Sequence, residues 1–148
     1  MTIQRPQRIT PPAPVGSMLK RPSALPQRSR SSTAREDHDH LALVRQLPCL
    51  YCGVEPCGEA AHVKFNCAAF GKANKLGRRP HDCDSVPLCR DDHQNARHAQ
   101  HKGSEEAFWN ALGISPYLVA KQLYAQRGDL VAMRAVIFLA IAERSRKA

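Results

Sequence analysis

Short apolar runs separated by polar segments characterise the middle of this 148-residue chain. The stretch 41–47, LALVRQL, predicts one or two helical turns, which Pro48 ends. Over residues 60–65, AAHVKF, the side chains alternate in a way that is typical of a strand with one buried face. This alternation places His62 on the open face of the predicted strand.

Apolar residues at helical spacing dominate the C-terminal part of the chain. A first helix is predicted to begin after Ser104, whose hydroxyl can cap it, and to end at Gly113. A second helix, opened by a Ser-Pro pair, stops at Gly128, and Asp129 begins a third. The apolar run 135–142 in this last helix indicates packing either against the domain or against a second copy of it.

The N-terminal segment has a different composition from the rest. Residues 1–38 hold six of the eleven prolines and few large apolar residues, so they cannot bury enough surface to offset the entropy of ordering. We therefore expect a disordered arm (1–38), a central domain (39–127) and a C-terminal helix (128–148).

Most of the net charge of +9 belongs to this arm. Residues 1–35 carry seven Lys or Arg and no acid, whereas residues 36–148 carry fifteen basic and thirteen acidic residues. A basic chain favours polyanionic partners, and DNA is the partner that we expect. The alternative is a solvated tail that only aids solubility.

The cysteine content bears on the cellular compartment. The sequence has neither an apolar run long enough to span a membrane nor a visible secretory signal, so we expect a cytoplasmic protein without a membrane segment. In a reducing cytoplasm, six cysteines clustered with histidines indicate metal binding rather than disulfides.

A zinc site is predicted from the spacing of the cysteines. Cys49 and Cys52 form a CxxC motif followed directly by glycine, which is typical of a zinc knuckle. Cys89 is the best candidate for a third ligand. Asp92 is the candidate for the fourth, and His93 competes with it. Because the apolar runs between these residues are short, a metal ion is expected to replace part of the core.

Two alternatives remain for the cysteines. Cys83 could replace Asp92 as a ligand, although the simpler expectation is that Cys57, Cys67 and Cys83 are small buried or half-buried residues. The CxxC pair could instead be a redox pair, but the chain lacks the βαβ pattern in which that motif usually occurs.

Three further histidines follow in the metal-rich segment. His93 lies where a helix should begin, and His101 comes eight residues later, about 2.2 turns, so a straight helix would point both the same way. His98 fits this spacing less well. Three histidines in one such segment favour metal ligands over surface residues.

A basic segment lies between His62 and Asp82 and contains no acid. Such a segment can clamp the phosphate backbone of a nucleic acid, and its alternative is a solvated loop. Its basic residues are Lys64, Lys72, Lys75, Arg78 and Arg79.

The order of these motifs resembles the small phage and prophage branch of the HNH (ββα-metal) nucleases, which includes recombination-enhancement nucleases. The resemblance covers roughly residues 43–117. It is carried by CxxCG, the strand ending AAHVKF, the basic insert, the Asp-x4-Pro-Leu-Cys string, and a later His before Gly-x4-Phe-Trp. It implies an α+β fold in which a two-stranded hairpin and a helix surround one catalytic divalent ion, with C-terminal helices closing a zinc-stapled core.

The resemblance also implies roles for single residues. His62 matches the general base that deprotonates a water molecule. His93 and His101 match ligands of the catalytic ion. Asp82 matches the polar residue that orients the base, and Asp84 is its rival for that role.

The function that we expect is divalent-metal-dependent hydrolysis of DNA phosphodiester bonds, with structural zinc on the cysteines and magnesium, manganese or zinc as the catalytic ion. The alternative is a non-catalytic, zinc-containing DNA-binding module of the same fold. Two departures from the family pattern bear on this choice. Ala61 stands where many relatives have a second histidine, and Asp92 stands where Cys or His is usual.

Overall fold

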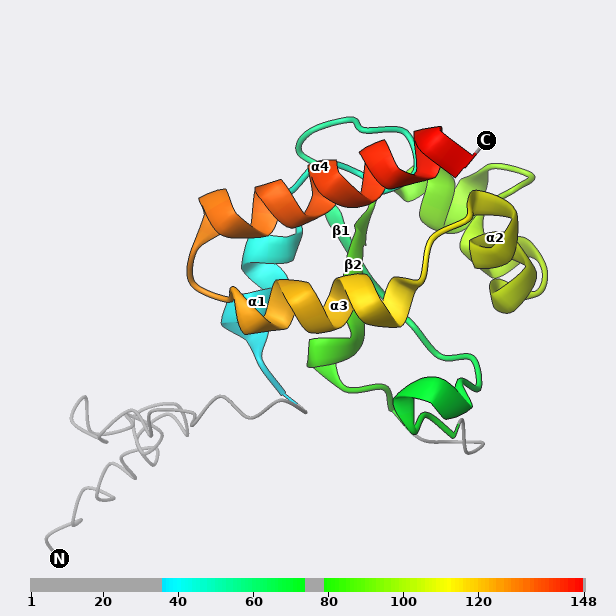
Figure 1. The fold of residues 1–148 in the computed structure, drawn as a ribbon, viewed down its shortest axis with the longest axis horizontal. Helices are drawn as coiled ribbons and strands as arrows, with labels where there is room; N and C mark the ends of the chain where they lie inside the picture. The colour runs from blue at the N-terminus through cyan, green and yellow to red at the C-terminus, as the bar shows by residue number, and fades with distance from the viewer. Residues whose placement is uncertain (1–35, 74–78, 148) are drawn as a thin grey trace, which may run out of the picture. The chain divides into compact units, whose positions relative to one another are not determined.

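The computed structural model of the protein describes residues 36–73 and 79–147. Residues 1–35 of the predicted arm, together with Lys75 and Arg78, lie outside the described residues. The predicted mixture of helices with a small amount of strand is confirmed (Figure 1). In chain order the regular elements are α1 (His38–Val44), β1 (Glu59–His62), a 3₁₀ turn (Ala68–Phe70), a second 3₁₀ turn (Asp82–Asp84), β2 (Ser85–Leu88), a π-helical segment (Asp91–Asn95), a third 3₁₀ turn (Gln100–Lys102), α2 (Glu105–Leu112), α3 (Pro116–Ala125) and α4 (Leu130–Lys147).

The two strands form an antiparallel sheet whose register sets the positions of the functional side chains. Glu59 pairs with Leu88 at one end, and His62 pairs with Ser85 at the other. Between them Ala61, which is wholly buried, pairs with an equally buried valine of β2. The alternation predicted from the sequence therefore holds, with His62 only half-buried.

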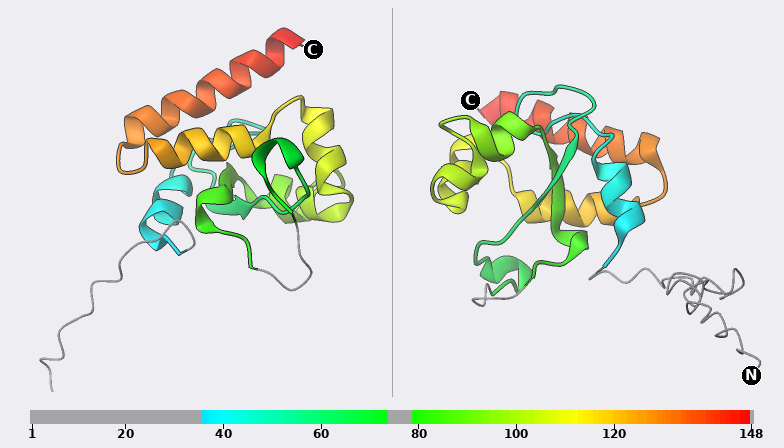
Figure 2. Two further views of the ribbon diagram at one scale, coloured as in Figure 1. Left: turned by 60° about the horizontal axis from the view of Figure 1, so that its bottom comes forward. Right: turned by 180° about the vertical axis from the view of Figure 1, so that it is seen from behind.

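Helices enclose this small sheet. α1 contacts both strands, and α3 contacts β2 and also α4 (Figure 2). The core that results includes residues from every one of these elements and from the CxxC loop. Its largest wholly buried side chains are Val44, Leu47, Leu50, Val86, Leu88, Trp109, Leu123, Met133 and Ile137.

Both ends of α2 and the start of α4 lie where the sequence predicts them, whereas α1 lies three residues earlier than the predicted 41–47. The Ser104 hydroxyl accepts a hydrogen bond from the backbone N–H of Ala107 at 3.3 Å, and Gly113 ends α2 with a positive φ of 68°. Asp129 Oδ1 accepts hydrogen bonds from two backbone N–H groups in the first turn of α4, both at 3.0 Å. α3 ends at Ala125, shortly before Gly128.

Two features extend or qualify the sequence predictions. α1 begins at His38, and its cap residue Asp37 is buried, so both lie in the folded part although the predicted arm ran to residue 38. In α4, Ile137 is buried in the core, whereas Phe138 is 52% and Leu139 is 61% exposed. Packing against the domain therefore accounts for only one side of the apolar run.

One histidine of α1 is buried. His40 is wholly buried, and neither of its ring nitrogens has a hydrogen-bond partner among the described residues. Its ring meets that of Tyr124 edge to face, with 5.0 Å between the ring centroids. Burial lowers the pKa of His40; the charge of Arg127 adds to this, while the charge of Asp37 opposes it.

This burial predicts acid sensitivity. The pKa of His40 is lower in the folded than in the unfolded chain, where it is about 6.5, so stability falls as pH drops below about 6.5. In His40→Phe, which keeps a ring against Tyr124, the loss of unfolding free energy between pH 7.5 and 5.5 should be smaller than in the wild type. Denaturant melts at both pH values measure it, and equal losses in the two proteins would refute the assignment to His40.

Candidate metal centre and active site

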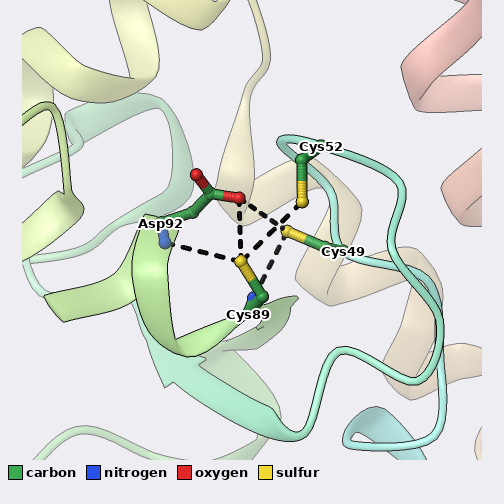
Figure 3. A group of neighbouring side chains, drawn as sticks. All are labelled: Cys49, Cys52, Cys89 and Asp92. Carbon is green, nitrogen blue, oxygen red and sulfur yellow. Dashed lines mark hydrogen bonds between the residues drawn. The ribbon is translucent and has the colours of Figure 1, made fainter. Parts of the chain in front are cut away.

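Three cysteines and one aspartate converge where the CxxC loop meets the end of β2 (Figure 3). One ligand atom from each residue lies within 4.8 Å of the others. The sulfurs of Cys52 and Cys89 are 3.7 Å apart, and Asp92 Oδ2 lies 3.2 Å from the sulfur of Cys49 and 3.0 Å from that of Cys89. Two sulfurs bound tetrahedrally to one zinc at about 2.3 Å would be about 3.8 Å apart. The group therefore fits a zinc-like ion in donor type and in spacing.

The local backbone geometry positions the ligand atoms of the three cysteines. The N–H of Gly53 donates to the carbonyl of Cys49 at 2.9 Å, and Gly53 adopts a φ of +78°, which turns the loop back on itself. Across the site, the N–H of Cys89 points at the sulfur of Cys49 at 3.3 Å, and the N–H of Asp92 points at the sulfur of Cys89 at 3.5 Å. Such N–H groups stabilise negative charge on sulfur.

The thiols of the group carry their protons when no metal ion is bound. Burial, reinforced by the Asp92 carboxylate, raises the pKa of Cys52 and of Cys89 to about 11, and burial raises the pKa of Cys49 as well. Burial would also raise the pKa of Asp92, but hydrogen bonds from Cys89, Cys52 and His98 outweigh it and hold that pKa below its usual value. A metal ion would therefore displace thiol protons when it binds.

The competing fourth ligands lie elsewhere. His93 is not a member of the group with the sulfurs, and its Nδ1 lies 2.7 Å from Glu59 Oε2. Cys83 groups instead with His81 and Asp84, where one ligand atom from each residue lies within 4.8 Å of the others. The ammonium of Lys72 already pairs with both oxygens of Asp84, so this second group needs no metal ion. Cys57 is buried, and Cys67 and Cys83 are half-buried, as predicted for structural cysteines.

The histidine of β1 forms a pair with a buried carboxylate. His62 Nε2 lies 3.0 Å from Asp82 Oδ1, and Asp82 is wholly buried. Burial would raise the pKa of Asp82, but the hydrogen bonds from His62 and from the backbone N–H of Asp37 outweigh it and lower that pKa. An ionised carboxylate can only accept, so Nε2 of His62 carries a proton, and in the neutral ring Nδ1 is the acceptor. Asp84, the rival for this role, pairs with Lys72.

The two predicted histidine ligands come together on an unexpected backbone. The prediction of a straight helix from His93 to His101 is wrong. The π-helical segment stops at Asn95, and Ala96 is extended, with a ψ of 158°. The chain then turns back through the 3₁₀ turn, and the two rings still meet, with centroids 4.6 Å apart. Among the described residues, no third His, Cys, Asp or Glu has a ligand atom within 4.8 Å of both.

Glu59 was not among the residues predicted to be functional. Besides His93, its carboxylate accepts hydrogen bonds from Arg90 at 3.1 Å and from Gln94 at 3.1 Å. Burial would raise the pKa of Glu59, but His93 and Arg90 together lower it. The ionised carboxylate holds the proton on Nδ1 of His93 and leaves Nε2 as the ligand atom, as in many metal sites. The only sequence signal was an acid on the same short strand as His62.

The basic segment contributes to a cavity that is lined by Val63 and His81, the chain neighbours of His62 and Asp82, but not by either member of the pair itself. Lys64, Lys72, Arg79 and His81 are among the residues that line this cavity, whose volume is about 220 Å³. Two of these cations already face acids, since Lys72 pairs with Asp84 and an Arg79 nitrogen lies 3.9 Å from Asp82 Oδ1. The described basic residues thus gather on one surface, with part of their charge compensated.

Comparisons with known proteins identify no relative. No protein-family model matches the chain, and neither a curated protein nor a solved structure is significantly similar to it. Among the helices of the described residues, none has the length and apolar character to cross a membrane.

The raised thiol pKa values yield a prediction for metal binding. Each zinc bound by Cys49, Cys52 and Cys89 should release about three protons near neutral pH, so affinity should rise with pH. Titrating zinc into the chelator-treated protein in buffers of different ionisation enthalpy measures this number. Cys89→Ser should lower it to about two and lower the melting temperature. Cys67→Ser, outside the group, is the matched control. Release of one proton or none would contradict a three-thiolate site.

Proposed function

We propose that the protein is a metal-dependent nuclease of the HNH type that hydrolyses phosphodiester bonds of DNA, with structural zinc on Cys49, Cys52, Cys89 and Asp92. The sequence resemblance motivates this proposal. The observation that carries it is the hydrogen bond between His62 and the wholly buried Asp82. Basic side chains line a cavity that the chain neighbours of both residues reach.

The pair supplies a general base. With its Nε2 proton held by Asp82, His62 can take a proton from a water molecule at Nδ1 as that water attacks phosphorus. The buried carboxylate then stabilises the imidazolium that forms, as it does in other histidine–carboxylate pairs. Lys64 and Arg79, which line the adjacent cavity, are suited to hold the phosphates that flank the scissile bond.

His93 and His101 are the residues that would hold the catalytic ion. Two imidazoles suit zinc or another transition metal, and an open site can accept water and phosphate oxygens. A divalent ion there would offset the charge that grows on the phosphate oxygens. Gln100 donates to the backbone carbonyl of His62 at 3.2 Å, so the segment with His101 lies beside the strand with His62.

Two observations favour the alternative, a non-catalytic DNA-binding module with the same zinc centre. Ala61 is wholly buried, and the pair His93–His101 lacks a third ligand among the described residues. Cleavage assays with the wild-type protein decide between the two functions.

Removal of the base should nearly abolish cleavage. His62→Ala should lower the rate of plasmid cleavage by about 10²–10⁴, the usual contribution of a general base, while zinc content and DNA affinity stay unchanged. Asp82→Asn should also lower the cleavage rate, because the asparagine amide can donate to Nε2 of His62 and so force the ring proton onto Nδ1. His38→Ala, on the exposed side of α1, is the control. If His62→Ala cleaves as fast as the wild type, the non-catalytic module becomes the better assignment.

Loss of a metal ligand should differ from loss of the base in its response to metal. His93→Ala should also lose activity, and excess manganese or zinc should restore part of it. Glu59→Ala should raise the metal concentration needed for half-maximal cleavage by about 10- to 100-fold, since it removes the partner of Nδ1. Excess metal should not rescue His62→Ala. If it rescues His62→Ala and His93→Ala equally, the two roles have been assigned wrongly.

A further inference from the structure

A histidine outside the metal ligands contacts the far side of the fourth ligand. Asp92 Oδ2 lies among the sulfurs, whereas Asp92 Oδ1 lies 2.9 Å from Nε2 of His98. A carboxylate that binds a metal ion has no proton and can only accept, so His98 donates this hydrogen bond from Nε2. The carboxylate is thus held at one oxygen and presents the other to the metal centre.

The ring of His98 is itself held by the CxxC loop. It stacks on Tyr51, with 4.6 Å between the centroids and 16° between the ring planes. Tyr51 also stacks with Phe108 of α2, with centroids 5.7 Å apart. Because Tyr51 lies between Cys49 and Cys52, one ring contact joins the loop that carries two ligands to the donor that orients a third.

This arrangement matches the electrostatics of the site. Three thiolates and one carboxylate around a divalent ion leave a net charge of −2, so an N–H donor on the outer oxygen is favourable. An aspartate is also less constrained than a cysteine, because its two oxygens can exchange or bind together. The side chain of His98 is 49% exposed, so packing of the core does not explain its orientation.

We propose that His98 is a positioning residue of the metal centre: its hydrogen bond to Asp92 Oδ1, braced by the stack on Tyr51, directs Oδ2 at the ion and keeps water from the fourth position. The inference rests on the metal site alone and not on nuclease activity. Its test therefore needs no cleavage assay and is unaffected if the nuclease proposal fails.

The test compares three substitutions in the full chain by zinc competition with a chromogenic chelator. His98→Ala should weaken zinc binding by about 10- to 100-fold, the usual cost of losing an outer hydrogen bond. His98→Gln, which keeps a donor, should retain most of the affinity. His98→Phe, which keeps only the ring, should bind as weakly as the alanine variant. His38→Ala, a histidine on α1, is the matched control and should bind as the wild type does.

Cobalt substitution separates an orienting residue from a ligand. In His98→Ala the thiolate-to-cobalt charge-transfer band should persist, because all three cysteines remain, while the d–d bands change as water enters. In an Asp92→Ala background, adding His98→Ala should change neither the affinity nor the bands, because the acceptor is already gone.

Three results would overturn the proposal. Zinc affinity of His98→Ala within twofold of the wild type would show that the hydrogen bond is irrelevant to the site. Full affinity of His98→Phe would assign the effect to the ring stack alone. Cobalt bands that are unchanged in Asp92→Ala but lost in His98→Ala would make His98 itself the fourth ligand.

Discussion

The contact between the CxxC loop and the end of β2 is the constraint on which the rest of the structure depends. It joins Cys49 and Cys89, which are 40 residues apart, and places Asp92 beside both. The same two segments are tied by a backbone hydrogen bond from Leu50 to Pro87 at 2.9 Å and by the buried side chain of Leu50. Apart from this contact, the segment after β2 has little regular structure, so a metal ion would set the direction in which it leaves the sheet.

The hairpin register then places the two histidine pairs. Glu59 and His62 lie at opposite ends of a four-residue strand, roughly 10 Å apart along the backbone. Glu59 contacts His93 because the chain turns at the metal group directly after β2. His62 contacts Asp82 because the 3₁₀ turn that contains Asp82 directly precedes β2. With His98 on Asp92, three carboxylates each hold one ring nitrogen. In each pair the carboxylate fixes the proton on the ring nitrogen that it contacts, and it makes no contact with the second ring nitrogen.

The sequence was sufficient for the features set by local spacing. Short turns bring Cys49 to Cys52 and Cys89 to Asp92, and these two halves could be read from local spacing. The contact between the CxxC loop and the end of β2 joins them, and the four predicted ligands form one group. Helix caps at Ser104 and Asp129 depend only on neighbouring residues, and they too were predictable. The choice between Asp82 and Asp84 was not, because both lie in one 3₁₀ turn and only Lys72, from a distant loop, separates their roles.

Contacts between segments that are distant in the sequence account for the features of the site that the sequence did not predict. The register that brings Glu59 to His93 cannot be read from either segment alone. The helix predicted from His93 to His101 assumed a period of 3.6, but the turn at Ala96 changes that period while the rings still meet. His98 lies six residues after Asp92, a separation that no regular element makes adjacent.

The burial of Ala61 limits what the strand can contribute to chemistry. Ala61 faces the core, so a polar ligand in its place would point into apolar packing unless the register shifted. The open face of the four-residue strand offers only two positions, and His62 occupies one of them. An ion on His93 and His101 would therefore complete its coordination with water or with oxygens of a bound phosphate. Metal affinity at that pair would then depend on the substrate, whereas the cysteine group, which has its own four ligands, would hold its ion without any substrate.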